Sequence, residues 1–259
     1  MNLHALDWSI LALPLAAGLL VLATHVPLGA QVLDRGIVFI DLAVAQMAGL
    51  GVIVADALGF PDHGVAVQVA AVIAALAGAA LLAWTERRAA QQQEALIGVS
   101  FVLAACAGIL VLAGNPHGGE HLKDLLVGQI LWVDSAQLGW LALVSALVGI
   151  GLRAGVPQRF GHFGFYGLFA LAVTASVQLV GVYLVFSSLI IPALATRWFD
   201  RRARLPAAYA IGAAGFALGL VLSALLDLPS GAVIAWALAG CGLLGALLRT
   251  QRAKRAIAR

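Results

Sequence analysis

The chain has 259 residues, of which 63% are hydrophobic and only 10% charged, and its formal net charge is +3. Its mean hydropathy is +1.02, whereas soluble domains are roughly half apolar and a quarter charged. The composition therefore excludes a soluble globular domain and predicts an all-α, polytopic membrane protein.

Long apolar runs recur from one end of the chain to the other. Most reach the roughly 17 to 25 residues that a helix needs to span a bilayer. The runs are Trp8–Gly29, Gly36–Phe60, Gly64–Trp84, Ala95–Ala113, Gln137–Leu152, Gly164–Leu194, Pro206–Leu226 and Gly231–Leu248. We expect the first run to be a transmembrane span and not a cleaved signal peptide, because no Lys or Arg precedes it and no clear cleavage pattern follows.

Between the fourth and fifth runs lies "HLKDLLVGQILWVDSAQ", whose apolar core, Leu125–Val133, is too short to cross a bilayer. Half-length elements at membrane depth need protein or water to satisfy their backbone, which is typical of transport pathways. We expect a short segment near residues 124–134 that either dips into the membrane and returns or lies at the interface with Trp132 as its anchor.

The run Gly164–Leu194 is too long for one ordinary span and short for two. If the chain turns back near Leu179–Gly181, every basic residue except Lys123 falls on the same side of the membrane, as the positive-inside rule requires. The sequence then predicts about eight to nine transmembrane helices, an outer amino terminus and a cytoplasmic carboxyl terminus. No segment outside the runs is long enough to fold alone, so residues 1–259 form a single transmembrane domain.

This topology gathers acidic and imidazole side chains on the outer face, which suits the arrival of cations. An ordinary solvated surface is the alternative. These residues are His4, Asp7, Asp62, His63, His117, Glu120, His121, Asp124 and Asp227. The basic inner loops suit anionic lipid or a cytoplasmic partner better than nucleic acid.

Two polar groups lie within the second run. An ionisable side chain in hydrocarbon raises the free energy by at least a few kcal/mol and usually faces a cavity or a partner, so Asp41 and Gln46 are candidate contacts for a transported cation. Alternatively, Asp41 pairs with Arg35, which lies about 9 Å away along a helix.

The stretch "HGGEH", from His117 to His121, matches the H-x-x-E-H signature of a metalloprotease. That signature needs a helix to bring both histidines onto one metal, and here two glycines interrupt a loop. We expect His117, Glu120 and His121 to hold an arriving cation transiently or to contact a delivery protein, with a plain polar loop as the alternative. No G-x-x-x-x-G-K-[ST] sequence occurs, so the motor of an ATP-driven transporter would be another chain.

Four stretches carry a family resemblance. They are "VLDRGIVFIDLAVAQMAGLGV" (Val32–Val52), "EALIGVSFVLAACAGIL" (Glu94–Leu110), "VQLVGVYLVFSSLIIPALATR" (Val177–Arg197) and "DLPSGAVI" (Asp227–Ile234). In this order the chain resembles the permease subunits of the bacterial metal-type ABC importers, the zinc, manganese and iron family.

The resemblance implies a homodimeric permease of the bacterial inner membrane, a separate cytoplasmic ATPase that binds the ATP, and an extracytoplasmic substrate-binding protein. It implies no permanently bound cofactor, since the metal ion is cargo. In such permeases the third stretch resembles a turn followed by a short, broken helix. Gly181 would allow the turn, Ser187 and Ser188 would satisfy freed backbone groups, and Pro192 would prevent a continuous rod. The loop Arg153–Phe163 is where the ATPase would dock.

One departure from the family pattern concerns the metal. The family commonly has a histidine four residues after the aspartate, where this chain has Ala45, with Gln46 one step further. On a regular helix, four residues place two ligands about 40° apart, whereas five place Asp41 and Gln46 about 140° apart. The missing imidazole also removes a ligand that zinc favours.

The sequence therefore favours the permease subunit of an ATP-driven importer, itself not an enzyme, which moves a divalent transition metal or a metal chelate by alternating access. A motor-independent secondary transporter or channel, with Asp41 as its proton or cation site, is the alternative. An intramembrane metalloenzyme built on His117, Glu120 and His121 is a distant third.

Overall fold

The computed structural model describes residues 8–60, 64–113 and 126–257, and these residues form helices and connecting turns with no strand. The helices are α1 (Trp8–Arg35), α2 (Ile40–Ala57), α3 (Val65–Ala89), α4 (Gln93–Leu112), α6 (Ser135–Arg153), α7 (Val156–Ala195), α8 (Arg201–Leu226) and α9 (Ser230–Ile257). Two 3₁₀ turns, η2 (Ala90–Gln92) and η3 (Ile130–Trp132), precede α4 and α6. The all-α prediction is confirmed.

Seven helical stretches in the described chain are long and apolar enough to cross a membrane, slightly fewer than the eight to nine predicted. The difference lies in two long stretches that contain a break. Val65–Leu112 holds both α3 and α4, which meet at η2, and Val156–Ala195 is interrupted at Gly181. Dividing each of these stretches at its break recovers the upper predicted number.

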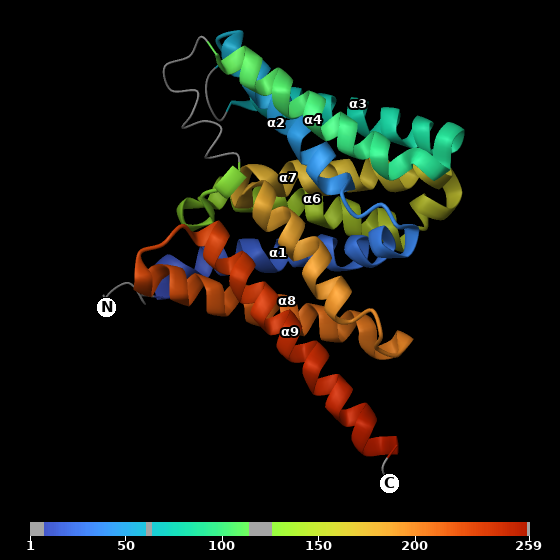
Figure 1. The fold of residues 1–259 in the computed structure, drawn as a ribbon. Helices are drawn as coiled ribbons and strands as arrows, with labels where there is room; N and C mark the ends of the chain where they lie inside the picture. The colour runs from blue at the N-terminus through green and yellow to red at the C-terminus, as the bar shows by residue number, and fades with distance from the viewer. Residues whose placement is uncertain (1–7, 61–63, 114–125, 258–259) are drawn as a thin grey trace.

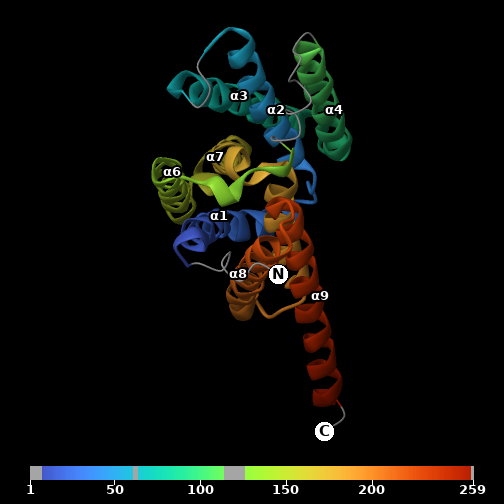
Figure 2. The same ribbon diagram turned by 90° about the vertical axis from the view of Figure 1, so that its left-hand side faces the viewer.

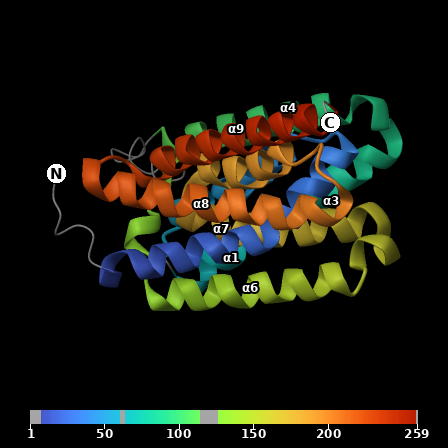
Figure 3. The ribbon, with the colours of Figure 1, turned by 90° about the horizontal axis from the view of Figure 1, so that it is seen from below.

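Helix α7 is the centre of the bundle. It contacts α1, α2, α3, α6, α8 and α9. In Figures 1 and 2, α2, α3 and α4 lie on one side of α7, whereas α1, α8 and α9 lie on the other. Seen from below in Figure 3, α1, α6 and α8 run alongside one another. The remaining long helix, α4, packs mainly on α2 and α3.

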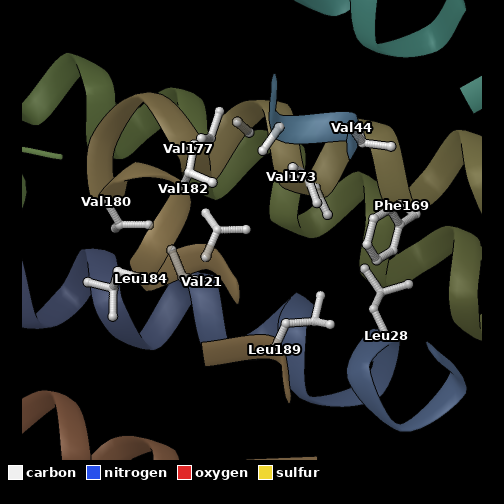
Figure 4. Packing of buried hydrophobic residues seen from close by; sticks show 14 of the residues in the cluster. Val21, Leu28, Val44, Phe169, Val173, Val177, Val180, Val182, Leu184 and Leu189 are labelled. Carbon is white, nitrogen blue, oxygen red and sulfur yellow. The ribbon is translucent and has the colours of Figure 1, made fainter. Parts of the chain in front are cut away.

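The core is built where both arms of α7 meet α1 and α2. Figure 4 shows Val173 and Val177 of the first arm and Leu184 and Leu189 of the second arm among side chains of α1 and α2. All four are buried, as is Val21 of α1. Because a bilayer removes the hydrophobic driving force between helices, this close packing is what holds the arms in place.

The predicted turn in the run Gly164–Leu194 occurs at Gly181. Its φ of 76° and ψ of 162° lie in a region that only glycine adopts readily, and the two arms of α7 double back on each other in Figure 1. The backbone of Gly128 packs directly against Gly181, with no space for a Cβ on either residue. The amide of Gln129 donates to the carbonyl of Leu179 at 3.0 Å.

The short segment before α6 therefore packs against the break in α7 at Gly181. Ile130 within η3 is fully buried, whereas Trp132 is exposed. Gly231, at the start of α9, also packs against the carbonyl of Val127. The two family stretches that contain Gly181 and Gly231 thus meet on one short segment, which is too short to cross the membrane, as the sequence predicts.

Several helices extend beyond the predicted apolar runs. Helix α1 continues past Gly29 to Arg35, although Pro27 removes an amide donor from its interior. The carbonyl of Ala23, four residues before Pro27, instead accepts a hydrogen bond from the Tyr209 hydroxyl at 3.2 Å. Polar residues thus mark the end of the apolar run but not the end of the helix.

Contacts among basic loops place them at one end of the bundle. Arg204 pairs with Asp34 at 3.1 Å, so the start of α8 lies beside the end of α1. The guanidinium of Arg35 stacks on the ring of Phe165 at 4.1 Å, and that of Arg87 stacks on Phe163 at 4.5 Å. The loops after α1, α3, α6 and α7 are therefore neighbours, as the turn at Gly181 requires.

Candidate translocation site

Asp41 lies in the first turn of α2, near the basic end of the bundle. Its side chain is fully buried, and neither carboxylate oxygen has a hydrogen-bond partner among the described residues. Gln46 follows on the same helix and is 5% exposed. Helix α2 is buried around most of its circumference by α3, α4 and α7. Asp41 and Gln46 can therefore both be buried while facing different neighbours, and their burial does not show that they share one cation site.

A second carboxylate lies close to Asp41. Glu94 is in the first turn of α4, and its Oε1 accepts a hydrogen bond at 3.3 Å from the amide of Phe39, which lies just before α2. Its Oε2 is buried and has no partner in the described chain. The ring of Phe39 stacks on Phe186 of the second α7 arm, with centroids 6.2 Å apart.

The chemistry of this pair follows from its surroundings. Asp41 is buried and Glu94 is half-buried, so their two carboxylates repel each other, although the amino termini of α2 and α4 favour negative charge there. A cation or a proton would remove the repulsion and satisfy the unpartnered oxygens. The Phe39–Phe186 stack couples this place to the arm of α7 that follows the break.

The second arm contains the other predicted residues. The hydroxyls of Ser187 and Ser188 donate to the carbonyls of Tyr183 and Val185, at 2.8 and 2.9 Å. Pro192 lies inside the helix, and Thr196 donates to its carbonyl at 2.8 Å. The two serines therefore bond within their own helical turns, which locally weakens and bends a helix.

At the opposite end of the bundle the structure contains an open cavity of about 1020 Å³. It lies between the end of α2, the start of α3, the start of α6 and the part of α7 just before Gly181. Asp56 and Asp134 line it. Asp227 is at the end of α8 and exposed, outside the cavity lining. The two ends of the bundle thus differ in charge, basic at one and acidic at the other.

Other predicted ligands cannot be placed. His117, Glu120 and His121 lie outside the described residues, as do His4, Asp7, Asp62, His63 and Asp124. Within residues 8–60, 64–113 and 126–257, no three His, Cys, Asp or Glu side chains converge as a metal site.

Three polar residues that make contacts between helices, Glu94, His25 and Gln68, were missed by the sequence analysis. Glu94 opens a run quoted for its resemblance, but its proximity to Asp41 depends on how α2 and α4 pack. His25 lies unexposed in α1 and contacts Ser176 of α7 at 3.3 Å. Gln68 donates to Gln178 at 2.6 Å across α3 and α7. For His25 and Gln68 the available signal was a polar residue inside an apolar run, whereas Glu94 precedes its run and gave no such signal.

The fold and its two polar regions agree with a comparison to known families. The ABC 3 transport family matches residues 8–153 and 151–249, which is nearly the whole chain. The chain belongs to the ABC 3 transport family. The resemblance drawn from the four sequence stretches is thereby confirmed, and the protein is a multi-pass membrane permease of this family.

Relatives and solved structures extend the comparison. The chain is 26% identical to the manganese transport system membrane protein MntC of Halalkalibacterium halodurans, over 88% of this chain and 84% of the relative. It is also 26% identical to the chelated iron transport system membrane protein YfeD of Yersinia pestis, over 74% and 69%.

Two solved structures share the fold. PsaBC from Streptococcus pneumoniae in complex with Fab superposes with a TM-score of 0.75 at 19% identity, and the match covers 95% of each chain. An inward-facing metal-chelate type ABC transporter superposes with a TM-score of 0.67 at 18% identity, over 92% of this chain and 85% of that one.

Proposed function

We propose that the protein is the permease subunit of an ATP-binding-cassette importer that moves a divalent transition metal, namely zinc, manganese or iron, or a metal chelate, into the cell. The relatives named for manganese and chelated iron transport support the cargo class. The observation that carries the proposal is the buried, unpartnered carboxylate of Asp41 beside Glu94, packed against the broken helix α7 of an ABC 3 family chain.

Transport would proceed by alternating access between two copies of the chain. The basic end would face the cytoplasm and an ATPase subunit, while the acidic end would face outward, with the amino terminus outside, and receive cargo from a binding protein. Gly181, Ser187, Ser188 and Pro192 would let the second arm of α7 move relative to the first. Asp41, with Glu94 and Gln46, would contact the cargo on its way to release.

The ATPase would dock at the start of α7. Residues 156–160 form a short helical piece between Gly155 and Gly161, both of which have positive φ. Phe160 within it is 64% exposed, and Phe163 just after it contacts Arg87. An exposed aromatic side chain on a short helix between two glycine pivots suits a partner that pushes on α7.

A secondary cation transporter is the second candidate function. The same observation supports it, because the buried carboxylate of Asp41, near Glu94 and with no cationic partner in the described part of the chain, is a place to bind and release a proton. Under this alternative, transport would follow an ion gradient and would not require an ATPase.

Uptake into vesicles separates the two candidates. Vesicles carrying this chain and its ATPase would be supplied with labelled manganese, iron or zinc. ATP would be present or absent on the side of the membrane where the ATPase lies. We expect uptake of at least one metal to require ATP and to stop when the ATPase carries a catalytically dead substitution. Uptake that persists with the dead ATPase would refute the importer and support the secondary transporter.

A further inference from the structure

The open cavity at the acidic end is lined by carboxylates and amides on an otherwise apolar wall. It is bounded by α2, α3, α6 and the first arm of α7, next to the segment that seals Gly181. Its polar lining residues are Asp56, Gln68, Gln129, Asp134, Gln137 and Gln178. No Lys, Arg or His lines it in the described part of the chain. The charge of the lining therefore favours a cationic occupant.

The polar groups are arranged for hydrogen bonding. The Oε1 of Gln178 accepts from Gln68, while its buried Nε2 has no partner among the described residues. Asp134 caps α6 by accepting from the Gln137 amide at 2.8 Å, and its second oxygen is left for other partners. Among the described residues, no ion pair or hydrogen bond engages the Asp56 carboxylate.

Size argues against a bare ion. Six water molecules of about 30 Å³ each occupy about 180 Å³, so the cavity exceeds a hexahydrated ion several-fold. Among the described residues, no three His, Cys, Asp or Glu side chains converge there to ligate an ion directly. The cavity has room and hydrogen-bond groups for a cation that keeps its own ligands, and its apolar wall suits the organic part of such a complex.

We propose that this cavity receives the cargo as an intact cationic complex, a metal ion with its water or organic ligands still attached. The complex is held by the charges of Asp56 and Asp134 and by hydrogen bonds that its ligands donate to the side-chain oxygens of Gln68 and Gln178. This inference rests on the proposed function and deepens it, since it defines the form in which the metal enters the permease.

Exchange-inert complexes test this directly, because they cannot lose a ligand to a protein side chain. Hexamminecobalt(III) stands in for a hydrated ion, and tris(ethylenediamine)cobalt(III) stands in for a chelate. The full chain in phosphatidylcholine nanodiscs, without ATPase or ATP, would be titrated with each complex, and then with Mn²⁺ in competition. We expect at least one complex to bind and to displace Mn²⁺, and the stronger of the two identifies the natural ligand class.

Matched substitutions assign the binding to the cavity. Asp56→Asn combined with Asp134→Asn removes both charges and keeps an N-cap on α6, because Asn caps as well as Asp. We expect this variant to bind the complex about tenfold or more weakly. Asp227→Asn removes one charge at the same end of the bundle, at a φ of 53° that Asn tolerates, and should leave binding within about twofold.

Each outcome decides the matter. Mn²⁺ binding that neither inert complex displaces would show inner-sphere capture and overturn the proposal, as would equal weakening by Asp227→Asn. If the double variant does not fold, as judged by size-exclusion profile and thermal midpoint, the Asp56→Asn variant alone must show the loss. ATP-dependent uptake can survive any of these failures, so the proposed function and this inference are tested separately.

Discussion

Asp41 has the surroundings of a side chain kept for binding and not for stability. A carboxylate in hydrocarbon raises the free energy of the folded protein by at least a few kcal/mol unless a partner offsets it, and Asp41 has no partner among the described residues. Glu94 nearby increases the repulsion. An apolar residue at this position would leave the folded protein at lower free energy, which supports the proposal that Asp41 and Glu94 bind a cargo cation transiently.

Replacing Asp41 tests this directly. Asp41→Asn keeps the size of the side chain and removes its charge, so we expect ATP-driven metal uptake to fall about tenfold or more, by the loss of more than about 1.4 kcal/mol of cation interaction. The thermal midpoint should stay the same or rise, because a buried charge is gone. Vesicle uptake and a melting curve measure the two effects, and Asp227→Asn is the matched control. Full uptake by Asp41→Asn would remove Asp41 from the path.

Gln93 is a buried polar residue with the opposite character, because its hydrogen bonds are made. It donates to the Tyr166 hydroxyl at 3.0 Å and to the Leu82 carbonyl at 2.9 Å, and it accepts from Thr85 at 3.0 Å. It thereby ties α3 and α4 to the first arm of α7.

Gln93→Leu should lower the free energy of unfolding by about 1 to 3 kcal/mol, because it leaves buried groups unpaired. The exposed Gln92→Leu should change it by less than about 0.5 kcal/mol. In a double-mutant cycle, Tyr166→Phe together with Gln93→Leu should be less destabilising than the two single changes added. Strict additivity would show that the two side chains do not interact.

At the residue scale, the sequence identifies the costly groups but not their partners. Asp41 and Gln46 can be singled out because a polar residue within an apolar run is conspicuous. That Glu94 lies near Asp41, or that Gln68 meets Gln178, depends on the packing of helices far apart in the chain. Such contacts leave no local pattern.

At the scale of elements, the break in α7 positions the rest. Gly181 adopts backbone angles that glycine alone reaches readily, and Gly128 lies against it without room for a side chain. The short segment before α6 and the start of α9 both dock there. One backbone position thus joins three elements, and moving one arm of α7 would disturb the other two.

Gly181→Ala should therefore be severe. The conformational strain alone amounts to about 1 to 3 kcal/mol, and the clash with the Gly128 backbone adds to it. We expect a strongly lowered thermal midpoint or no monodisperse protein. Gly149→Ala, in a part of α6 with open space around the Cβ position, should be neutral or slightly stabilising. A Gly181→Ala protein as stable as the wild type would contradict the described turn.

The turn was predictable because charge constrains topology. The positive-inside rule favours an even number of arms between Arg159 and Arg197, and the short glycine-containing stretch in the middle is where the chain can reverse. Docking of the segment before α6 onto Gly181 and Gly231 was not predictable, since it joins parts of the chain some fifty residues apart or more. The number of membrane spans differs from the prediction because α3 and α4 are joined only by the short turn η2 and count as one helical stretch.

At the scale of the whole molecule, the two ends of the bundle have different chemistry. Arginines near three loops lie at one end, where Arg204 pairs with Asp34 and where Arg35 and Arg87 stack on aromatic rings at the start of α7. Carboxylates and amides line the cavity at the other end. Such polarity suits one-way delivery of a cation to a cytoplasmic motor, and it depends on the basic loops sharing a side of the membrane.

Site-directed labelling shows from which side of the membrane each loop can be reached. In a background of Cys106→Ala and Cys241→Ala, single cysteines would replace the exposed residues Arg88, Arg202 and Asp227, and intact cells would be treated with a membrane-impermeant maleimide. We predict that Asp227→Cys reacts at once and that Arg88→Cys and Arg202→Cys react only after the membrane is opened. If Arg88→Cys and Arg202→Cys react from opposite sides of the membrane, the folded-back α7 is contradicted. The proposed transport mechanism, which depends on it, would then be refuted.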